Sequence, residues 1–173
     1  LAHPYSLTQA LYWAAVLHHL RREAPLAQAR AEAAMTLGAD QGFSGPSVAQ
    51  ARPLRGWALA ACGHAEEGLA QLQQALGSSG GRETIRDRAY HLSLLVEVLA
   101  QVGQSATGRA TLSEALTTLP TTGACWWEAE LHRLRGVLLL QRTVPQPEEA
   151  DACFQQALTV ARRQQARSLE LRA

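Results

Sequence analysis

Small residues recur along this chain at intervals of about forty positions. The clearest series consists of alanines that stand 41, 40 and 42 residues apart: Ala34, Ala75, Ala115 and Ala157. A second series repeats every forty residues: Gly56, Val96 and Gly136. A fixed period of this length is typical of an array in which each copy is one supersecondary unit. The sequence therefore predicts a chain built from repeated units.

Each unit is predicted to be a pair of helices. In the last unit Leu131, Leu134 and Leu138 recur at the spacing of one helical face, and the small Gly136 would let a neighbouring helix approach closely. A proline-rich break at 144–147 precedes a second apolar stripe in the same unit. The pattern predicts an all-α fold with antiparallel pairs at about 5–42, 46–77, 83–120 and 126–165, and a further helix beginning at 167–173.

Composition supports helix and excludes some partners. Hydrophobic residues make up 47% of the 173 residues, most of them alanine and leucine, and the β-branched residues that favour strands are sparse. No apolar run reaches the ~18 residues needed to span a bilayer, so no membrane contact is expected. The net charge of +1 without a block of one sign argues against a nucleic-acid partner. Both ends look cut, which predicts one domain over 1–173 excised from a longer protein.

The sequence shows no catalytic or metal-binding pattern. It contains no lysine, so neither a Walker A loop nor a Schiff-base site is present, and the glycine-rich segment 77–81 is predicted to be a linker. His18 and His19, Cys62 with His64, and Cys125 with His132 all lack the companions that a zinc site needs. Three cysteines with no close pair fit a reducing, cytoplasmic setting. We therefore expect no enzyme activity, no cofactor and no metal.

The repeated residues resemble the tetratricopeptide repeat. That motif has small residues at its eighth and twentieth positions, glycine at the fifteenth, an aromatic residue or leucine at the twenty-fourth and alanine at the twenty-seventh. The second unit matches with Gly56, Gly63, Gly68, Leu72 and Ala75, and the third with Val96, Gly103, Gly108, Leu112 and Ala115. The fourth matches with Gly136, Ala150, Phe154 and Ala157 after a two-residue insertion near Pro145, and Pro120 matches the closing proline of the motif. The period near 41 is longer than usual, and the first unit matches only loosely.

Longer stretches of sequence make the family resemblance more specific. Those beginning at Trp57, Trp126, Ala152 and Ala161 look like the C-terminal region of large bacterial signalling proteins. Such proteins join a cyclase or DNA-binding domain to a predicted ATPase, which is followed by such repeats. The resemblance implies an α-solenoid of about four helix pairs with a right-handed superhelical twist. It also implies that this chain is a sensor or interaction arm, and that any ATPase or cyclase activity belongs elsewhere in the protein.

The resemblance also points to a binding face. In such repeats, certain positions of each first helix line a concave groove. Carried over to this sequence, they predict the following partner-binding residues: Tyr12, His19, Gln50, Trp57, Tyr90, Glu97, Gln101, Glu130, Arg133 and Gln141. Aromatic and arginine side chains beside polar groups suit a protein or peptide partner, which includes another domain of the same chain.

Several alternatives stay open at this stage. Tyr12 and Trp57 could simply pack between helices, and one residue of the pair Trp126 and Trp127 is expected to pack against the preceding unit. The chain could be a structural or oligomerisation arm that forms a homo-oligomer. It could also bind a small effector, in which case an apolar pocket with convergent polar groups around Trp57, Tyr90 and Arg133 would be expected.

Overall fold

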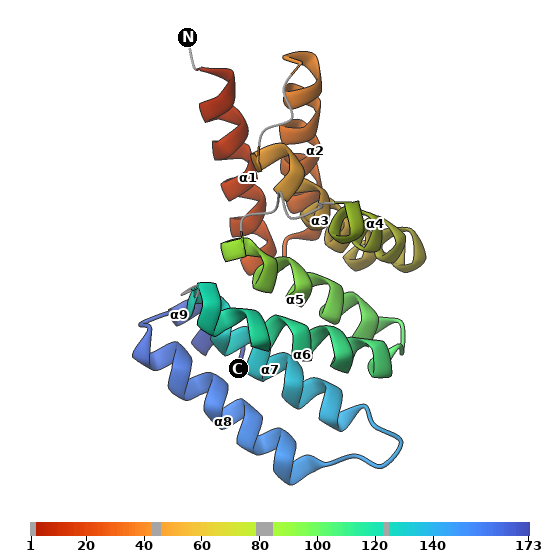
Figure 1. The fold of residues 1–173 in the computed structure, drawn as a ribbon, viewed down its shortest axis with the longest axis vertical. Helices are drawn as coiled ribbons and strands as arrows, with labels where there is room; N and C mark the ends of the chain where they lie inside the picture. The colour runs from red at the N-terminus through yellow and green to blue at the C-terminus, as the bar shows by residue number, and fades with distance from the viewer. Residues whose placement is uncertain (1–2, 43–45, 79–84, 123–124) are drawn as a thin grey trace. The chain divides into compact units, whose positions relative to one another are not determined.

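The computed structural model describes residues 3–42, 46–78, 85–122 and 125–173, and these residues form helices joined by turns (Figure 1). The chain divides into two compact units, Leu1–Thr84 and Ile85–Ala173. The predicted all-α class and the packing of adjacent helices in pairs are confirmed. A continuous solenoid of four pairs, its right-handed twist and a single domain stay predictions. The expected helix start at 83 and most of the expected linker at 77–81 lie outside the described residues.

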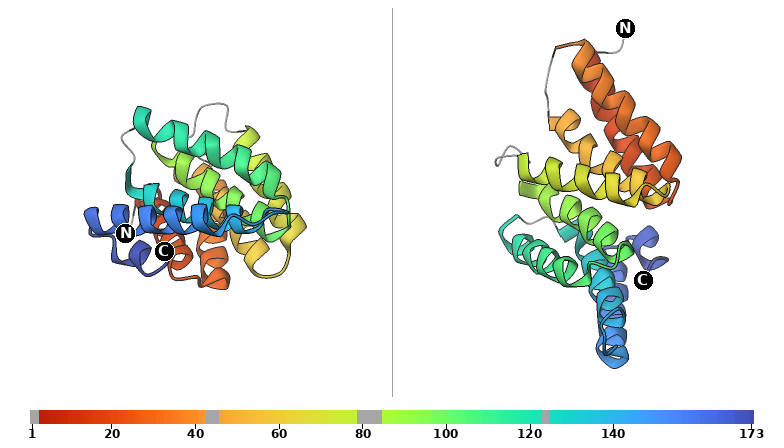
Figure 2. Two further views of the ribbon diagram at one scale, coloured as in Figure 1. Left: turned by 90° about the horizontal axis from the view of Figure 1, so that it is seen from below. Right: turned by 90° about the vertical axis from the view of Figure 1, so that its right-hand side faces the viewer.

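The first compact unit contains two helix pairs, which correspond to the first two predicted repeats. Its helices are α1 (Pro4–Leu20), α2 (Ala24–Asp40), α3 (Pro46–Ala61) and α4 (Ala65–Ser78). Each helix packs against the next, and α1 also contacts α3. The views in Figure 1 and Figure 2 agree that α1 and α2 run side by side in opposite directions. The face of α2 that packs inward carries only alanine and glycine (Ala24, Ala27, Ala31, Ala34 and Gly38), so the neighbouring helices can approach its backbone closely.

The second unit repeats this arrangement and adds a short terminal helix. Its elements are α5 (Ile85–Gln101), α6 (Ser105–Thr122), a 3₁₀ turn (Cys125–Trp127), α7 (Glu128–Leu140), α8 (Pro147–Arg163) and α9 (Arg167–Glu170). The helix α7 contacts α5, α6 and α8, and α9 packs against α8. Helices α7 and α8 lie side by side and antiparallel, as Figure 1 shows.

In three of the helix pairs, the same type of turn joins the first helix to the second. The N–H of Gly63 donates to the carbonyl of Ala60, and the N–H of His64 donates to that of Leu59. The same two bonds recur after α5, around Gly103, and after α1, around Arg22. These three residues have left-handed φ values of +98°, +76° and +61°. The glycines that match the fifteenth repeat position, Gly63 and Gly103, therefore lie in the turns that follow α3 and α5, and the loosely matching first pair turns in the same way as the second and third.

Glycines permit close helix contact at matching places in the two units. A Cβ on Gly56 would lie 3.0 Å from Leu72, and one on Gly136 would lie 2.6 Å from the ring of Phe154. These are the eighth and twenty-fourth positions of the repeat in both cases. The expectation that Gly136 admits a neighbouring helix is confirmed.

Prolines lie within two helices. Pro53 lies inside α3, whose bounds agree with the prediction, so this helix continues through a residue that cannot donate a backbone hydrogen bond. The helix α6 runs to Thr122, whereas the sequence predicted its end at Pro120. The turn from Leu140 to Pro147 is longer than the other three, as the insertion near Pro145 indicated.

Candidate functional site

The predicted groove residues of the first unit lie in its interior. Tyr12, His19, Gln50 and Trp57 are all buried. The rings of His19 and Trp57 meet edge to face with their centroids 4.4 Å apart, and the Arg22 guanidinium lies 5.8 Å from the Trp57 ring centroid. In this structure these side chains hold α1 against α3, and they present little surface to a partner.

The predicted groove residues of the second unit separate into two groups. Tyr90, Glu130 and Arg133 come together in one cluster, and Glu97 acts on the charge of Arg133. Gln101 and Gln141 are exposed, at the end of α5 and just after α7. The hydroxyl of Ser105 donates to the Gln141 side-chain oxygen at 3.2 Å.

A carboxylate shared by two arginines forms the centre of that cluster. Glu130 is 2% exposed, and its Oε1 accepts hydrogen bonds from Arg133 at 2.7 Å and from Arg172 at 2.6 Å. Its Oε2 accepts a second bond from Arg133 at 3.1 Å. Because both oxygens accept hydrogen bonds from arginines, Glu130 links α7 to the C-terminal segment after α9.

The electrostatics of Arg133 agree with this role. Burial opposes the charge on its guanidinium, but the hydrogen bonds and charge of Glu130, together with the charge of Glu97, outweigh burial. The pKa of Arg133 is therefore raised above its usual value. Arg133 and Arg172 thus both bind the Glu130 carboxylate in a largely buried place.

An aromatic group completes the cluster. Trp127 is buried, and its indole N–H donates to the hydroxyl of Ser93, which donates in turn to the carbonyl of Tyr90 at 2.6 Å. The Tyr90 ring meets Trp127 edge to face at 4.8 Å, and the guanidinium of Arg172 lies 5.9 Å from the Trp127 ring centroid. One of the paired tryptophans therefore packs against the preceding helix pair, as predicted.

The spacing of Glu130 and Arg133 indicates one pair of this cluster, since residues three apart share a helix face. The sequence analysis missed Arg172. It stands 42 residues beyond Glu130, and no local pattern connects the two. Its burial by Trp127 depends on how α9 packs, which only the structure supplies.

His132 has the features of a packed residue. Burial lowers its pKa, an effect that Glu128 opposes and Arg135 reinforces. Its Nε2 lies 3.9 Å from a Glu128 oxygen. Through the described ranges, no group of three or more histidine, cysteine or acidic side chains is placed to hold a metal ion.

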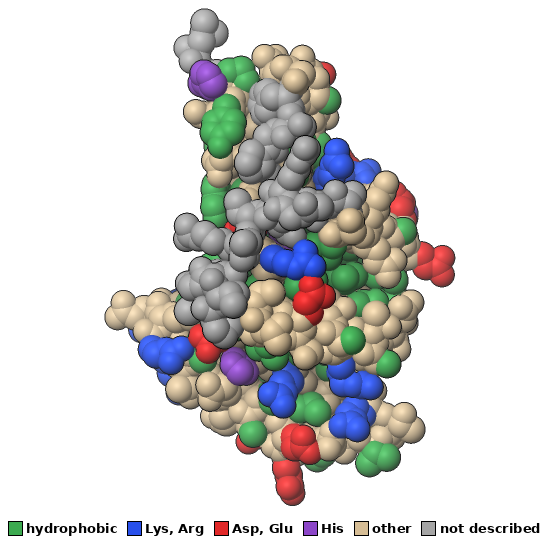
Figure 3. Space-filling view, in the orientation of Figure 1, with side chains coloured by type: hydrophobic (Ala, Val, Ile, Leu, Met, Phe, Trp, Pro, Cys, Tyr) green, Lys and Arg blue, Asp and Glu red, His purple; other side chains and the backbone are tan. Residues whose placement is uncertain are grey.

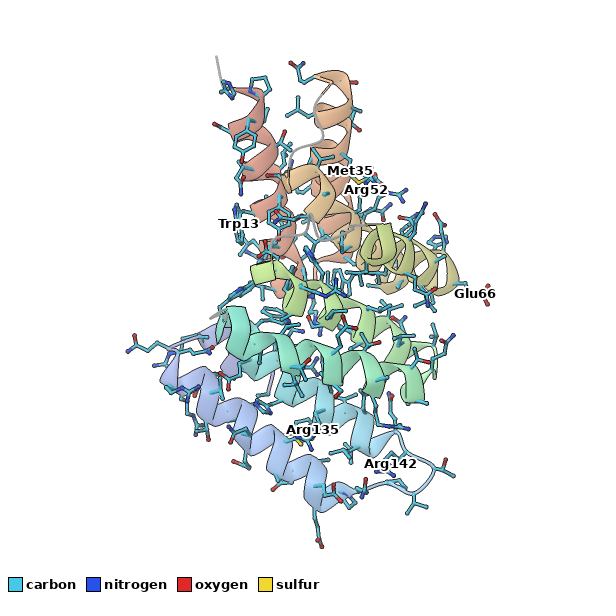
Figure 4. All side chains as sticks on the ribbon, in the orientation of Figure 1. Trp13, Met35, Arg52, Glu66, Arg135 and Arg142 are labelled. Atoms are coloured by element: carbon cyan, nitrogen blue, oxygen red, sulfur yellow. The ribbon has the colours of Figure 1, made fainter. Side chains whose placement is uncertain are left out.

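The sequence analysis did not single out an exposed apolar row on α1. Ala10, Trp13 and Leu17 face outward at a spacing of three and four residues, with Trp13 49% and Leu17 53% exposed. Tyr5 and Leu7 on the same helix are also largely exposed. Figure 4 labels Trp13 on α1. The large side chains of this row are uncharged, and a row of this spacing is the kind of face that helices bury elsewhere in this chain.

A depression in the second unit was also missed. It has a volume of about 390 Å³ and lies among α6, α7 and α8. Three arginines line it, Arg109, Arg135 and Arg142, together with four leucines, Leu112, Leu116, Leu138 and Leu139. Figure 3 shows blue side chains interspersed with green ones over this part of the molecule, and Figure 4 labels Arg135 and Arg142. A second depression, of about 300 Å³, adjoins it and shares Arg135, Leu139 and Glu149.

The arginines of this depression are weakly neutralised. Within the part of the chain that the structure describes, Arg109 and Arg135 form no ion pair, and Arg142 donates to the neutral side chain of Gln146. Glu149 also lines the depression, and it accepts a hydrogen bond from Gln146. Sequence reasoning overlooked this place because the family pattern directs attention to first helices, whereas α6 and α8 are second helices.

No family model, curated protein or solved structure matches this chain. Among the described residues, no helix has both the length and the apolar character that crossing a bilayer requires. The exposed row on α1 and the depression among α6, α7 and α8 are therefore judged by their own chemistry.

Proposed function

We propose that this chain is a non-catalytic, tetratricopeptide-like helical module that binds a partner protein. The matching contacts of Gly56 with Leu72 and of Gly136 with Phe154, together with the shared turns, support the family resemblance. The resemblance also provides the proposed setting, which is the interaction arm of a larger cytoplasmic bacterial regulator.

The exposed row on α1 is the observation that carries this proposal. Large apolar side chains that gather on one face of a helix mark interaction sites, and tryptophan is prominent among the residues that dominate binding energy. The small Ala10 lies between Ser6 and Trp13 and would let a partner approach the helix closely. The row follows the i, i+3, i+7 spacing of one helix face, which can pack against another helix. The partner element that fits this face is therefore an apolar helix of another protein.

The test compares two baits in a pull-down with quantitative mass spectrometry. One bait carries Trp13→Ser with Leu17→Ser. The control carries Leu26→Ser with Val144→Ser, which removes two exposed apolar side chains outside the row. We expect partners captured by the parent chain to be lost with the first bait and kept with the second, when both are equally helical by circular dichroism.

Light scattering after gel filtration shows whether the partner is a second copy of this chain. If the parent chain is a dimer and the α1 variant a monomer, the helix bound by this row belongs to a second copy and the module is an oligomerisation arm. If both baits retain the same partners, the row on α1 is not the binding face. The exposed groove residues Gln101 and Gln141 would then be the next to substitute.

A further inference from the structure

We propose a second binding site, independent of α1, in the depression among α6, α7 and α8. It would take an acidic segment of a partner protein that also carries leucine-sized apolar side chains. The α1 row and this depression use different residues and different chemistry, so either can fail without the other.

The positive charge of the arginines that line the depression predicts a negatively charged ligand. Arg109 and Arg135 have no ion pair among the described residues, and Arg142 makes only a neutral side-chain bond there. A single carboxylate, Glu149, stands against these three cations. Arginine presents a planar fork that binds carboxylates with two hydrogen bonds, so aspartate or glutamate side chains are the natural complement.

The leucines favour a peptide over a simple anion as the ligand of this depression. Leu112, Leu138 and Leu139 are 3%, 1% and 8% exposed, and Leu116 is partly exposed, so the arginines surround a small apolar floor whose accessible surface comes mainly from Leu116. A phosphate or a polyacid would pair with the arginines but would leave that floor uncovered. A segment with alternating acidic and apolar side chains satisfies both, in the manner of other peptide-recognition grooves.

The adjoining depression gives the site length. It shares Arg135, Leu139 and Glu149 with the first and extends along α7 and α8 past His132, Cys153 and Gln156. Arg135 therefore stands between two hollows of about 390 and 300 Å³. A continuous segment can occupy both hollows while one of its carboxylates pairs with Arg135.

Fluorescence anisotropy with a labelled synthetic peptide tests the proposal on the whole chain. The probe is an acetylated peptide with leucine at every third or fourth position and glutamate or aspartate elsewhere. One comparison peptide has glutamine in place of every acid, and another has alanine in place of every leucine. We expect the probe to bind best, and binding to weaken as salt rises.

Two double variants locate the site. Arg109→Gln with Arg135→Gln should weaken binding by about tenfold, the size expected for two arginines at the centre of an interface. Arg30→Gln with Arg52→Gln makes the same change in net charge at two exposed arginines of the first unit and should change binding less than about twofold. The variant Trp13→Ser with Leu17→Ser should bind the peptide as the parent does, which separates this site from the proposed function.

Four results would overturn the site. The first is no binding of the probe to the parent chain. The second is an equal loss of peptide binding in the two double arginine variants, which would indicate attraction by net charge alone or binding at the control arginines. The third is equal binding of the peptide that lacks leucine, because the apolar floor would then play no part. The fourth is a single-stranded oligonucleotide that binds as tightly as the probe.

Discussion

At the scale of single residues, Gly68 has the least room for a side chain among the described glycines. A Cβ there would lie 2.4 Å from the carbonyl oxygen of Gly56 and 2.7 Å from the backbone nitrogen of Ala60. Both neighbours are backbone atoms of α3, so neither can rotate away. The separation of α3 from α4 therefore depends on the absence of a side chain at this position.

We expect Gly68→Ala to lower the free energy of unfolding by about 1–3 kcal/mol, because the helices must move apart. Gly77 on the same helix provides the matched control, since a Cβ there meets nothing within 4 Å. Gly77→Ala should be neutral or raise the free energy of unfolding by up to about 1 kcal/mol. Urea unfolding followed by circular dichroism measures both, and equal effects would contradict the close contact.

At the scale of elements, α9 is attached to the second unit through few side chains. Leu169 is buried, Arg162 of α8 pairs with Glu170 at 2.9 Å, and Arg172 pairs with Glu130 at 2.6 Å. A helix of only four residues cannot be stable by itself, because nucleation is costly. Its position therefore depends on these contacts, and the contact of Arg172 is the most buried of the charged ones.

Arg172→Met is expected to lower the free energy of unfolding by about 1–3 kcal/mol, since it removes a charged hydrogen bond from a buried carboxylate. Arg167→Met removes a comparable bond, to Glu170 at 3.0 Å, but the Arg167 side chain is 87% exposed. We expect that control to change stability by less than about 1 kcal/mol. The same urea titration compares them, and a cost for Arg172→Met no larger than for Arg167→Met would show that the Glu130 cluster does not hold the C-terminal segment.

The elements themselves were largely predictable from the sequence. Proline and glycine mark the helix ends so clearly that the four pairs, and the helix ends at Gly63 and Gly103, follow from local chemistry. Pro120 misled because a proline does not always end a helix, and α6 continues for two residues beyond it. Arg22 shows the opposite case, in which the left-handed turn forms without the glycine that would have revealed it.

The candidate sites were less predictable, for a physical reason. Spacing along one helix reveals pairs such as Glu130 and Arg133, but Arg172 joins them only through tertiary packing. The depression among α6, α7 and α8 combines residues from three helices and a turn, with Arg109 and Arg142 standing 33 positions apart in the sequence. Periodicity indicates which face of a helix is apolar, but it does not indicate which faces remain uncovered after packing.

At the scale of the whole molecule, the two compact units raise the question of how independently they fold. The second unit has a core of its own, in which Leu94 and Leu99 from α5 and Leu131, Leu134 and Leu138 from α7 are almost fully buried. Its helices also contact one another in sequence, from α5 to α9. In helical repeats, stability is approximately the sum of terms within repeats and terms between neighbouring repeats.

We therefore expect the fragment 85–173 to fold when it is expressed alone, with helical circular dichroism and one cooperative thermal transition. Its transition should fall below that of the whole chain, because a chain of this size buries a smaller share of its surface. Within the fragment, Arg172→Met should still lower the transition, which would show that the Glu130 cluster has formed. A disordered spectrum would mean that the second unit requires the first, as in an array whose stability comes mainly from contacts between neighbouring pairs.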